Sequence, residues 1–222
     1  MASTVAVLAN STTPKDAIEG VNLDRTRVII DDGKNSSSYG VGNHMAGPVV
    51  VSSWVTQLNG KPANQFVVSP SLFQLSSGKT GKGTIRVVSD LPQDRESVFW
   101  LVVNTAAAGI ESKKNSVSFS LGQRIKVFYR PKGLEGDTHY AAKNLTWSYE
   151  AGTLKVKNPT GLSVSISDII SSKKSERIAS MVMPFSEASW KVPLGAEPQN
   201  LSFTFIDEYG GDNEVPLKLG AS

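Results

Sequence analysis

The chain has 222 residues, of which 39% are hydrophobic and 19% are charged, a composition that excludes an intrinsically disordered protein. It contains no cysteine, which excludes disulfide bonds and thiolate metal sites, and no apolar run approaches the roughly 18 residues of a membrane span. The net charge of +3 is divided unevenly. Residues 1–134 carry 15 Lys and Arg against 9 Asp and Glu, whereas residues 135–222 carry 8 against 11. We therefore expect two domains, of which the basic first one meets any anionic partner.

The first 19 residues differ in composition from the rest of the chain. The apolar stretch at residues 5–9 has no basic residue before it, so we do not expect an intact secretory signal peptide. Residues 10–16 are polar and typical of a linker. We expect an N-terminal arm or an added segment over residues 1–19. The composition is compatible with a cytosolic protein and with a secreted protein whose signal has been replaced.

From residue 20 onward the dominant hydrophobic period is two residues, which is typical of β-strands. Turn-forming pairs such as Asn59-Gly60 and Ser77-Gly78 separate many of these runs. No stretch shows the longer period of an amphipathic helix. The strands expected in the first half of the chain lie at residues 27–30, 49–55, 66–68, 84–88, 98–103, 116–121 and 125–129.

The second half of the chain shows the same two-residue hydrophobic period, interrupted by turns. Residues 145–149 and 153–156 flank Ala151-Gly152 as a predicted hairpin, and further strands are expected at residues 162–166 and 201–206. Short strands at this spacing are typical of antiparallel β-sandwiches. We place the hinge at residues 132–137, where the charge balance changes, and expect sandwiches over residues 20–131 and 138–222.

The residues give little support for catalysis or for nucleotide binding. Residues 78–84 (GKTGKGT) lack the earlier glycine of a phosphate-binding loop, because that position is Phe73, so we expect a basic hairpin. No Gly-x-Ser-x-Gly motif is present, and pairs such as Asp207-Glu208 are explained by solvated turns or ion pairs. The two histidines lie far apart, and isolated lysine pairs do not indicate nucleic-acid binding. We therefore expect no enzyme, no metal site and no nucleic-acid partner.

Residues 116–121 alternate strictly, with serine between the apolar residues Val117, Phe119 and Leu121. One interpretation is that the three apolar side chains face the core of their own sandwich. The other is that they lie on an exposed edge and face a partner. The periodicity does not choose between the two.

Three blocks of sequence together resemble the periplasmic chaperones of the chaperone–usher pilus pathway. They are LPQDRESVFW at residues 91–100, RIKVFYRP at residues 124–131 and FIDEYGG at residues 205–211. The blocks VNLDRTRVI at residues 21–29 and MPFS at residues 183–186 fit the same family pattern. The short segment between Asn104 and Lys126 resembles the subfamily with a short loop between strands F1 and G1.

This resemblance implies an all-β protein with two immunoglobulin-like β-sandwich domains in an L or boomerang arrangement, and a protein that is not an enzyme and needs no cofactor. Members of the family bind pilus subunits whose immunoglobulin-like fold lacks its last strand, and they lend their edge strand G1 to complete it. The resemblance also implies a periplasmic location and delivery of subunits to an outer-membrane usher. A bare apolar edge of this kind predicts self-association of the free protein.

The resemblance also assigns functional positions to individual residues. Arg27 and Lys126 match the two basic residues that anchor the C-terminal carboxylate of the subunit in the cleft. Val117, Phe119 and Leu121 match the donor-strand positions that fill the groove of the subunit.

Glu96, Arg130 and Glu208 match the interdomain ion pairs that set the angle between the domains, although other members have Asp at the position of Glu208.

Two other classes of function stay open from the residues alone. One is a generic immunoglobulin-like adhesion or binding module, and the other is an enzyme carried on a β-sandwich. Two cations lying side by side between the domains would favour the chaperone over both.

Overall fold

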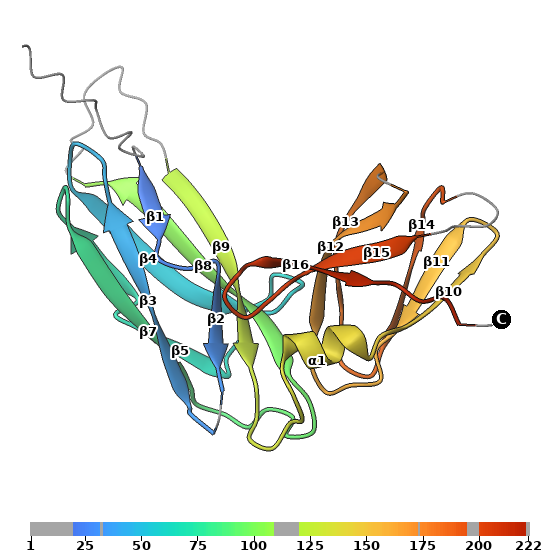
Figure 1. Ribbon diagram of the computed structural model, residues 1–222. Coiled ribbons are helices and arrows are strands. Elements are labelled where there is room, and N and C mark those ends of the chain that lie inside the picture. Colours follow the sequence, from blue (N-terminus) through green and yellow to red (C-terminus); the bar gives the residue numbers. More distant parts are fainter. Residues whose placement is uncertain (1–19, 32, 109–119, 173, 195–199, 221–222) are drawn as a thin grey trace, which may run out of the picture.

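The computed structural model describes residues 20–220 apart from residues 32, 109–119, 173 and 195–199. The first domain packs two sheets face to face, with strand orders β1-β3-β7-β5 and β2-β9-β8-β4-β6 (Figure 1). Its strands are β1 (Val21–Leu23), β2 (Arg27–Ile30), β3 (Ser36–Asn43), β4 (Val49–Thr56), β5 (Phe66–Ser69), β6 (Leu72–Leu75), β7 (Thr80–Val87), β8 (Ser97–Ala107) and β9 (Ser120–Tyr129). The segment predicted as a basic hairpin turns at Gly78, whose φ is +68°, and enters β7 at Thr80.

The chain changes sheet between β1 and β2, and this crossover shapes one edge of the first domain. β1 pairs with β3 in one sheet, and the backbone N–H of Asp24 makes a further bond to the Gly40 carbonyl. β2 then pairs in parallel with the last four residues of β9 in the other sheet. The first half of β9, residues 120–125, pairs with β8 on one side. Among the described residues no strand pairs with its other side.

The second domain is a smaller sandwich, with strand orders β10-β11-β14 and β13-β12-β15-β16. β10 and β11 meet at Ala151 and Gly152, both with positive φ, as the predicted hairpin requires. Its strands are β10 (Thr146–Glu150), β11 (Thr153–Lys157), β12 (Val164–Ser171), β13 (Lys174–Val182), β14 (Glu187–Lys191), β15 (Leu201–Ile206) and β16 (Asp212–Pro216).

No helix was expected from the sequence, but one short helix, α1 (Thr138–Lys143), follows the hinge. The side chain of Asp137 caps it by accepting a hydrogen bond of 2.8 Å from the Tyr140 N–H. Six residues are too few for an amphipathic period to show, which explains the omission. The fold class of two β-sandwiches is otherwise confirmed.

Each sandwich has its own hydrophobic core. Fully buried residues of the first core include Val28, Tyr39 and Leu101, and those of the second include Leu154 and Phe205. Since one core ends at Val127 and the other begins at Ala141, we propose the boundaries 20–131 and 138–222 for the two domains.

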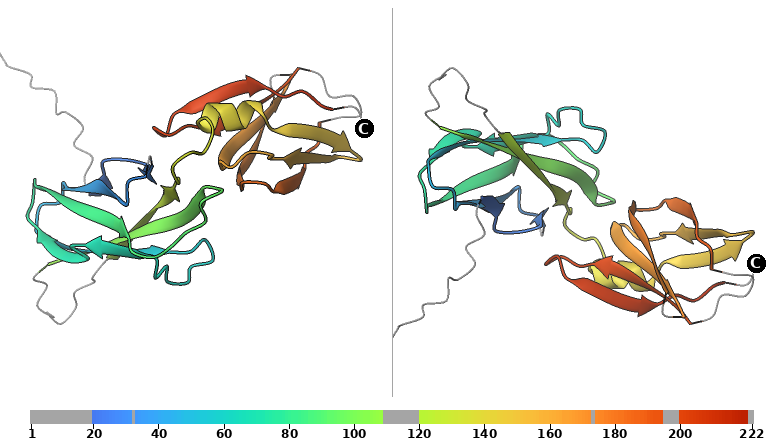
Figure 2. Two further views of the ribbon diagram at one scale, coloured as in Figure 1. Left: turned by 90° about the horizontal axis from the view of Figure 1, so that it is seen from below. Right: turned by 90° about the horizontal axis from the view of Figure 1, so that it is seen from above.

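The two sandwiches lie at an angle and meet at one end, close to α1 and to the loop between β15 and β16 (Figure 1). Views from below and above show that they are offset and touch over a small region (Figure 2). The junction brings β2 and β9 of the first domain against β12 and β15 of the second. This junction contains the candidate site.

Candidate functional site

Two cations lie side by side on the face of the first domain that meets the second. Arg27 is the first residue of β2, and it lies directly across the parallel ladder from Lys126 of β9. On the opposite side of β9, Lys126 is level with Trp100 of β8, and its ammonium lies 6.0 Å from the centre of that ring. The arrangement confirms that the two predicted anchor residues are neighbours.

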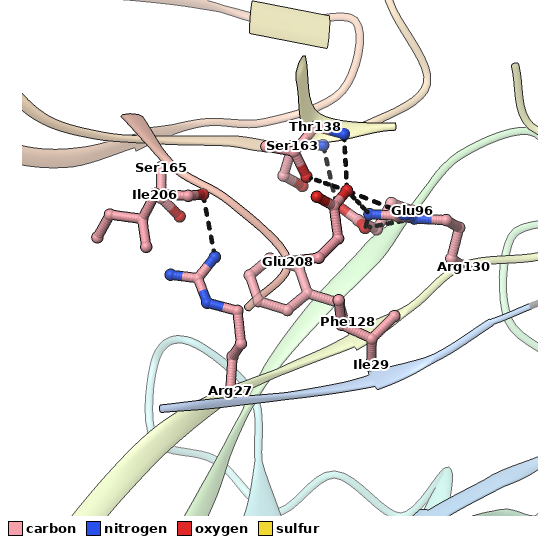
Figure 3. Close-up of a pocket in the computed structure, with 10 residues that line it drawn as sticks. All are labelled: Arg27, Ile29, Glu96, Phe128, Arg130, Thr138, Ser163, Ser165, Ile206 and Glu208. Atoms are coloured by element: carbon pink, nitrogen blue, oxygen red, sulfur yellow. Dashed lines mark hydrogen bonds and ion pairs between the residues drawn. The ribbon is translucent and has the colours of Figure 1, made fainter. Parts of the chain in front are cut away.

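Both cations make hydrogen bonds to neutral oxygens of the second domain. Arg27 Nη1 donates to the Ile206 carbonyl at 3.2 Å (Figure 3). Lys126 Nζ donates to Ser165 Oγ at 3.1 Å. Arg27 Nε is buried and has no acceptor, and among the described residues no carboxylate lies within ion-pair distance of either cation. The site therefore has positive charge and hydrogen-bond donors that no anion of the described chain satisfies.

The surroundings disfavour the positive charges. Burial, and to a smaller extent the neighbouring charge of Arg27, lowers the pKa of Lys126 to about 8. Burial also lowers the pKa of Arg27, against a smaller opposing effect of Asp207, Glu208 and Glu96. An anion bound between the two cations would relieve both effects, because an opposite charge stabilises the protonated forms.

A second group of charges joins the domains beside the two cations. Arg130 Nη2 lies 3.0 Å from Glu96 Oε1 and 3.4 Å from Glu208 Oε1. The second oxygen of Glu96 accepts a bond of 2.9 Å from the Ser163 N–H, which belongs to the second domain. Glu208 Oε1 accepts bonds from the Thr138 N–H at 2.7 Å and from its hydroxyl at 2.6 Å. The three residues predicted as interdomain ion pairs thus form one connected network, and the longer Glu208 side chain reaches Arg130.

The two carboxylates of this network have opposite pKa shifts. Burial raises the pKa of Glu96, and this outweighs the lowering by Arg130 and Ser163. Burial also acts to raise the pKa of Glu208, but the bonds from Thr138 and the charge of Arg130 outweigh it and hold the pKa below its ordinary value. The network borders a pocket of about 220 Å³, counting its open mouth, with Arg27 on its other side.

The predicted donor strand is described in part. Val117 and Phe119 lie outside the described residues, and Leu121 lies near the start of β9 with 48% of its surface exposed. On the same face of β9, Val127 is fully buried in the core and Ile125 packs against it. The apolar row of β9 therefore changes from a buried half to an exposed half.

Sequence reasoning did not find the residues of the second domain that complete the site. Ser165 and Thr138 are small polar residues in segments without a recognisable motif, and Ile206 contributes a backbone carbonyl rather than its side chain. Ile206 does lie in the block at residues 205–211 that carries the family resemblance. The family resemblance of that block was the sequence feature that could have pointed to the part of the site in the second domain.

Two family models match the chain. The model described as "Pili and flagellar-assembly chaperone, PapD N-terminal domain" matches residues 20–135, and "Pili assembly chaperone PapD, C-terminal domain" matches residues 140–216. The chain belongs to the family of pilus assembly chaperones. This family is non-enzymatic, and its members act in the chaperone–usher pathway.

Relatives of the chaperone carry names from the same pathway. The probable fimbrial chaperone LpfB of Escherichia coli O157:H7 is 30% identical over 204 residues, which are 90% of this chain and 88% of LpfB. The SafB chaperone, solved in complex with the SafA pilin of Salmonella enterica, has a TM-score of 0.79 and 26% identity, over 90% of this chain and 95% of that one. The periplasmic chaperone SfaE has a TM-score of 0.76 and 27% identity, over 90% and 100% of the two chains.

Two kinds of feature are absent from the described part of the chaperone. It contains no group of three or more His, Cys, Asp or Glu side chains arranged to hold a metal ion. It also contains no helix with the length and apolar composition to cross a membrane.

Proposed function

We propose that this chaperone binds pilus subunits by lending them the first half of β9, and that Arg27 and Lys126 hold the C-terminal carboxylate of the subunit. The observation that carries the proposal is a strand edge that leads directly to two partly buried cations. In the part of the chain that the structure describes, the edge has no partner strand and the cations have no counter-ion. The complex between SafB and a pilin supports subunits as partners.

The exposed half of β9 suits the addition of a strand. Residues 120–125 pair with β8, and no other described strand pairs with them, so the backbone groups on their other side suit an incoming strand. Leu121 presents an exposed apolar side chain on this half, as a groove-filling residue must. Full burial of one such side chain contributes about 1.5–3 kcal/mol before the costs of association.

The two cations define where such a strand ends and in which direction it runs. An incoming strand along residues 120–125 lies in line with β2, whose first residue, Arg27, occupies the next position along the edge. A chain that places its C-terminal carboxylate at Arg27 therefore runs in the same direction as β2, parallel to β9. The carboxylate then accepts charge-assisted hydrogen bonds from both cations, which fixes the register of the strand.

Delivery of the subunit to an outer-membrane usher and a periplasmic location belong to the same proposal. The family acts in the chaperone–usher pathway, and the similar chaperone SfaE is described as periplasmic. We also propose that the free edge of β9 can pair with a second copy of the chaperone, because a bare edge accepts any compatible strand. Family membership supports these functions over a generic adhesion module.

Replacing Leu121 with serine tests the donor strand. We expect the melting temperature to change little, because about half of the side chain is already exposed. Capture of a co-expressed pilus subunit should weaken roughly tenfold through lost apolar burial. The matched control is Ile125→Ser on the same face of the same strand, which should lower stability by about 2–4 kcal/mol because Ile125 packs on the core. A large loss of stability in Leu121→Ser with capture retained would contradict the proposal.

The pH dependence of binding tests the anchor. Since the pKa of Lys126 is about 8 in the free chaperone and a bound carboxylate raises it, affinity should be highest below pH 8. Above pH 8 the affinity should fall by up to about tenfold per pH unit.

The stability of the free chaperone should depend on pH in the opposite direction and rise with pH. The lowered pKa makes the unfolded chain bind more protons between pH 8 and 10.5, so Lys126 contributes rising stability there.

The measurement is the dissociation constant of a subunit peptide across this pH range. Lys126→Arg is the control, because arginine stays protonated and should remove the decline above pH 8. An equal decline in the wild type and in Lys126→Arg would contradict the role of Lys126.

A further inference from the structure

The hairpin between β15 and β16 is the part of the second domain that touches the anchor directly. The carbonyl of Ile206, the last residue of β15, accepts the hydrogen bond from Arg27. Further along the same hairpin, Gly210 has φ +89° and packs against Thr26, so that a Cβ atom at Gly210 would overlap the Thr26 hydroxyl. The hairpin thus contacts the first domain at Arg27 and at the residue before it (Figure 1).

Asp207 holds this hairpin in shape. Its Oδ1 accepts hydrogen bonds from the backbone N–H groups of Tyr209 at 2.9 Å and Gly211 at 2.8 Å. Its Oδ2 accepts a bond of 2.9 Å from Asn213 Nδ2, and its own N–H donates to the Gly211 carbonyl at 2.9 Å. The Asp207 carboxylate therefore fixes the turn that follows the Ile206 carbonyl.

We propose that Asp207 is a positioning residue for the carboxylate anchor, acting through the Ile206 carbonyl on the orientation of the Arg27 guanidinium. Arg27 makes no other hydrogen bond among the described residues, and its Nε has no acceptor, so the Ile206 carbonyl is the hydrogen-bond partner that orients the guanidinium. The guanidinium also lies over the Phe128 ring, 5.6 Å from the ring centre. The inference rests on the proposed function, because it concerns how the anchor receives the partner carboxylate.

Asp207 affects the anchor in two opposite ways. As the centre of the turn it orders the hairpin, which favours binding by holding Arg27 in place. As a negative charge it acts on Arg27 and opposes an incoming carboxylate. The variant Asp207→Asn keeps an oxygen that can accept from the two backbone N–H groups but removes the charge. The variant Asp207→Ala removes both.

The experiment measures binding of a fluorescein-labelled synthetic peptide of alternating valine and threonine that ends in a free carboxylate, with the same peptide ending in an amide as reference. We expect Asp207→Ala to weaken binding of the acid peptide about tenfold. Asp207→Asn should bind it at least as tightly as the wild type. Melting temperatures check that both variants are folded. Wild-type affinity in Asp207→Ala, or equal losses in the two variants, would overturn the inference.

Double variants separate positioning from a general loss of structure. In the Arg27→Ala background, Asp207→Ala should cause no further weakening of binding, whereas in the Lys126→Ala background it should weaken binding by its full amount. An undiminished effect in the Arg27→Ala background would overturn this inference alone. If Arg27→Ala and Lys126→Ala bind the acid and amide peptides like the wild type, the proposed function is overturned and this inference with it.

Discussion

Replacing Arg27 with alanine is expected to abolish stable complexes with a pilus subunit and to leave the chaperone folded. Among the described residues the side chain makes one hydrogen bond, to the Ile206 carbonyl, lies over the Phe128 ring and has no ion-pair partner, so we expect its removal to cost the fold little. Removing one member of a desolvated charge pair costs about 2–5 kcal/mol of binding, or roughly thirtyfold to several-thousandfold in affinity. Lys126→Ala should have an effect in the same range.

The measurement is co-purification of a co-expressed subunit with the tagged chaperone, alongside thermal melting of each variant. Lys61→Ala is the matched control, since Lys61 is an exposed cation of the same domain on the loop between β4 and β5, and it should capture the subunit normally. Normal recovery of the complex by both anchor variants would contradict the assignment of Arg27 and Lys126.

Replacing Arg130 with alanine should lower the stability of the chaperone by about 3–5 kcal/mol, because it leaves a buried carboxylate unpaired. Glu96 is 2% exposed, and without Arg130 the Ser163 N–H is the one hydrogen-bond donor to its carboxylate that remains among the described residues. The loss should be smaller at acid pH than at neutral pH. Protonation of Glu96, whose pKa burial already raises, then removes the unpaired charge.

Chemical denaturation at two pH values measures this effect, and two variants serve as controls. Arg177→Ala removes an exposed arginine that lies 3.9 Å from Asp168, and it should cost at most about 1 kcal/mol. Glu96→Gln should cost less than Arg130→Ala, because the amide oxygen can still accept from Ser163 and no unpaired charge is buried. A cost for Arg130→Ala no larger than that for Arg177→Ala would show that the network contributes little to stability.

The strands that could be predicted from the sequence are those that alternate between core and solvent. β2, β4 and β8 carry regular apolar runs, and their predicted positions agree with the structure within a few residues. β3 was missed because it reads Ser-Ser-Ser-Tyr-Gly-Val-Gly-Asn. Its glycines lie where neighbouring chain comes close: a Cβ atom at Gly40 would be 3.0 Å from Asp24 Oδ2. Because close packing of this kind favours glycine over apolar side chains, β3 has no alternating apolar pattern from which a strand could be predicted.

The candidate site was predicted by family resemblance and not by periodicity. Alternation placed Arg27 and Lys126 on strands, but it gave no information that these strands are paired in parallel with the two residues opposite each other. That pairing depends on the crossover between β1 and β2, which is a property of the fold. The roles of Val117, Phe119 and Leu121 stay predictions.

The parallel pairing of β2 with β9 has a consequence for which chains the chaperone can accept. β2 already occupies the edge of β9 from Lys126 onward, so a strand added along residues 120–125 meets the backbone of β2 end to end. In the proposed binding mode the continuation of an internal segment of a polypeptide would collide with Arg27, whereas a chain terminus fits. We therefore expect the edge to discriminate by where a chain stops as well as by its side chains. A protein whose strand edge is open to other chains would in this way avoid capturing the interior segments of other unfolded proteins.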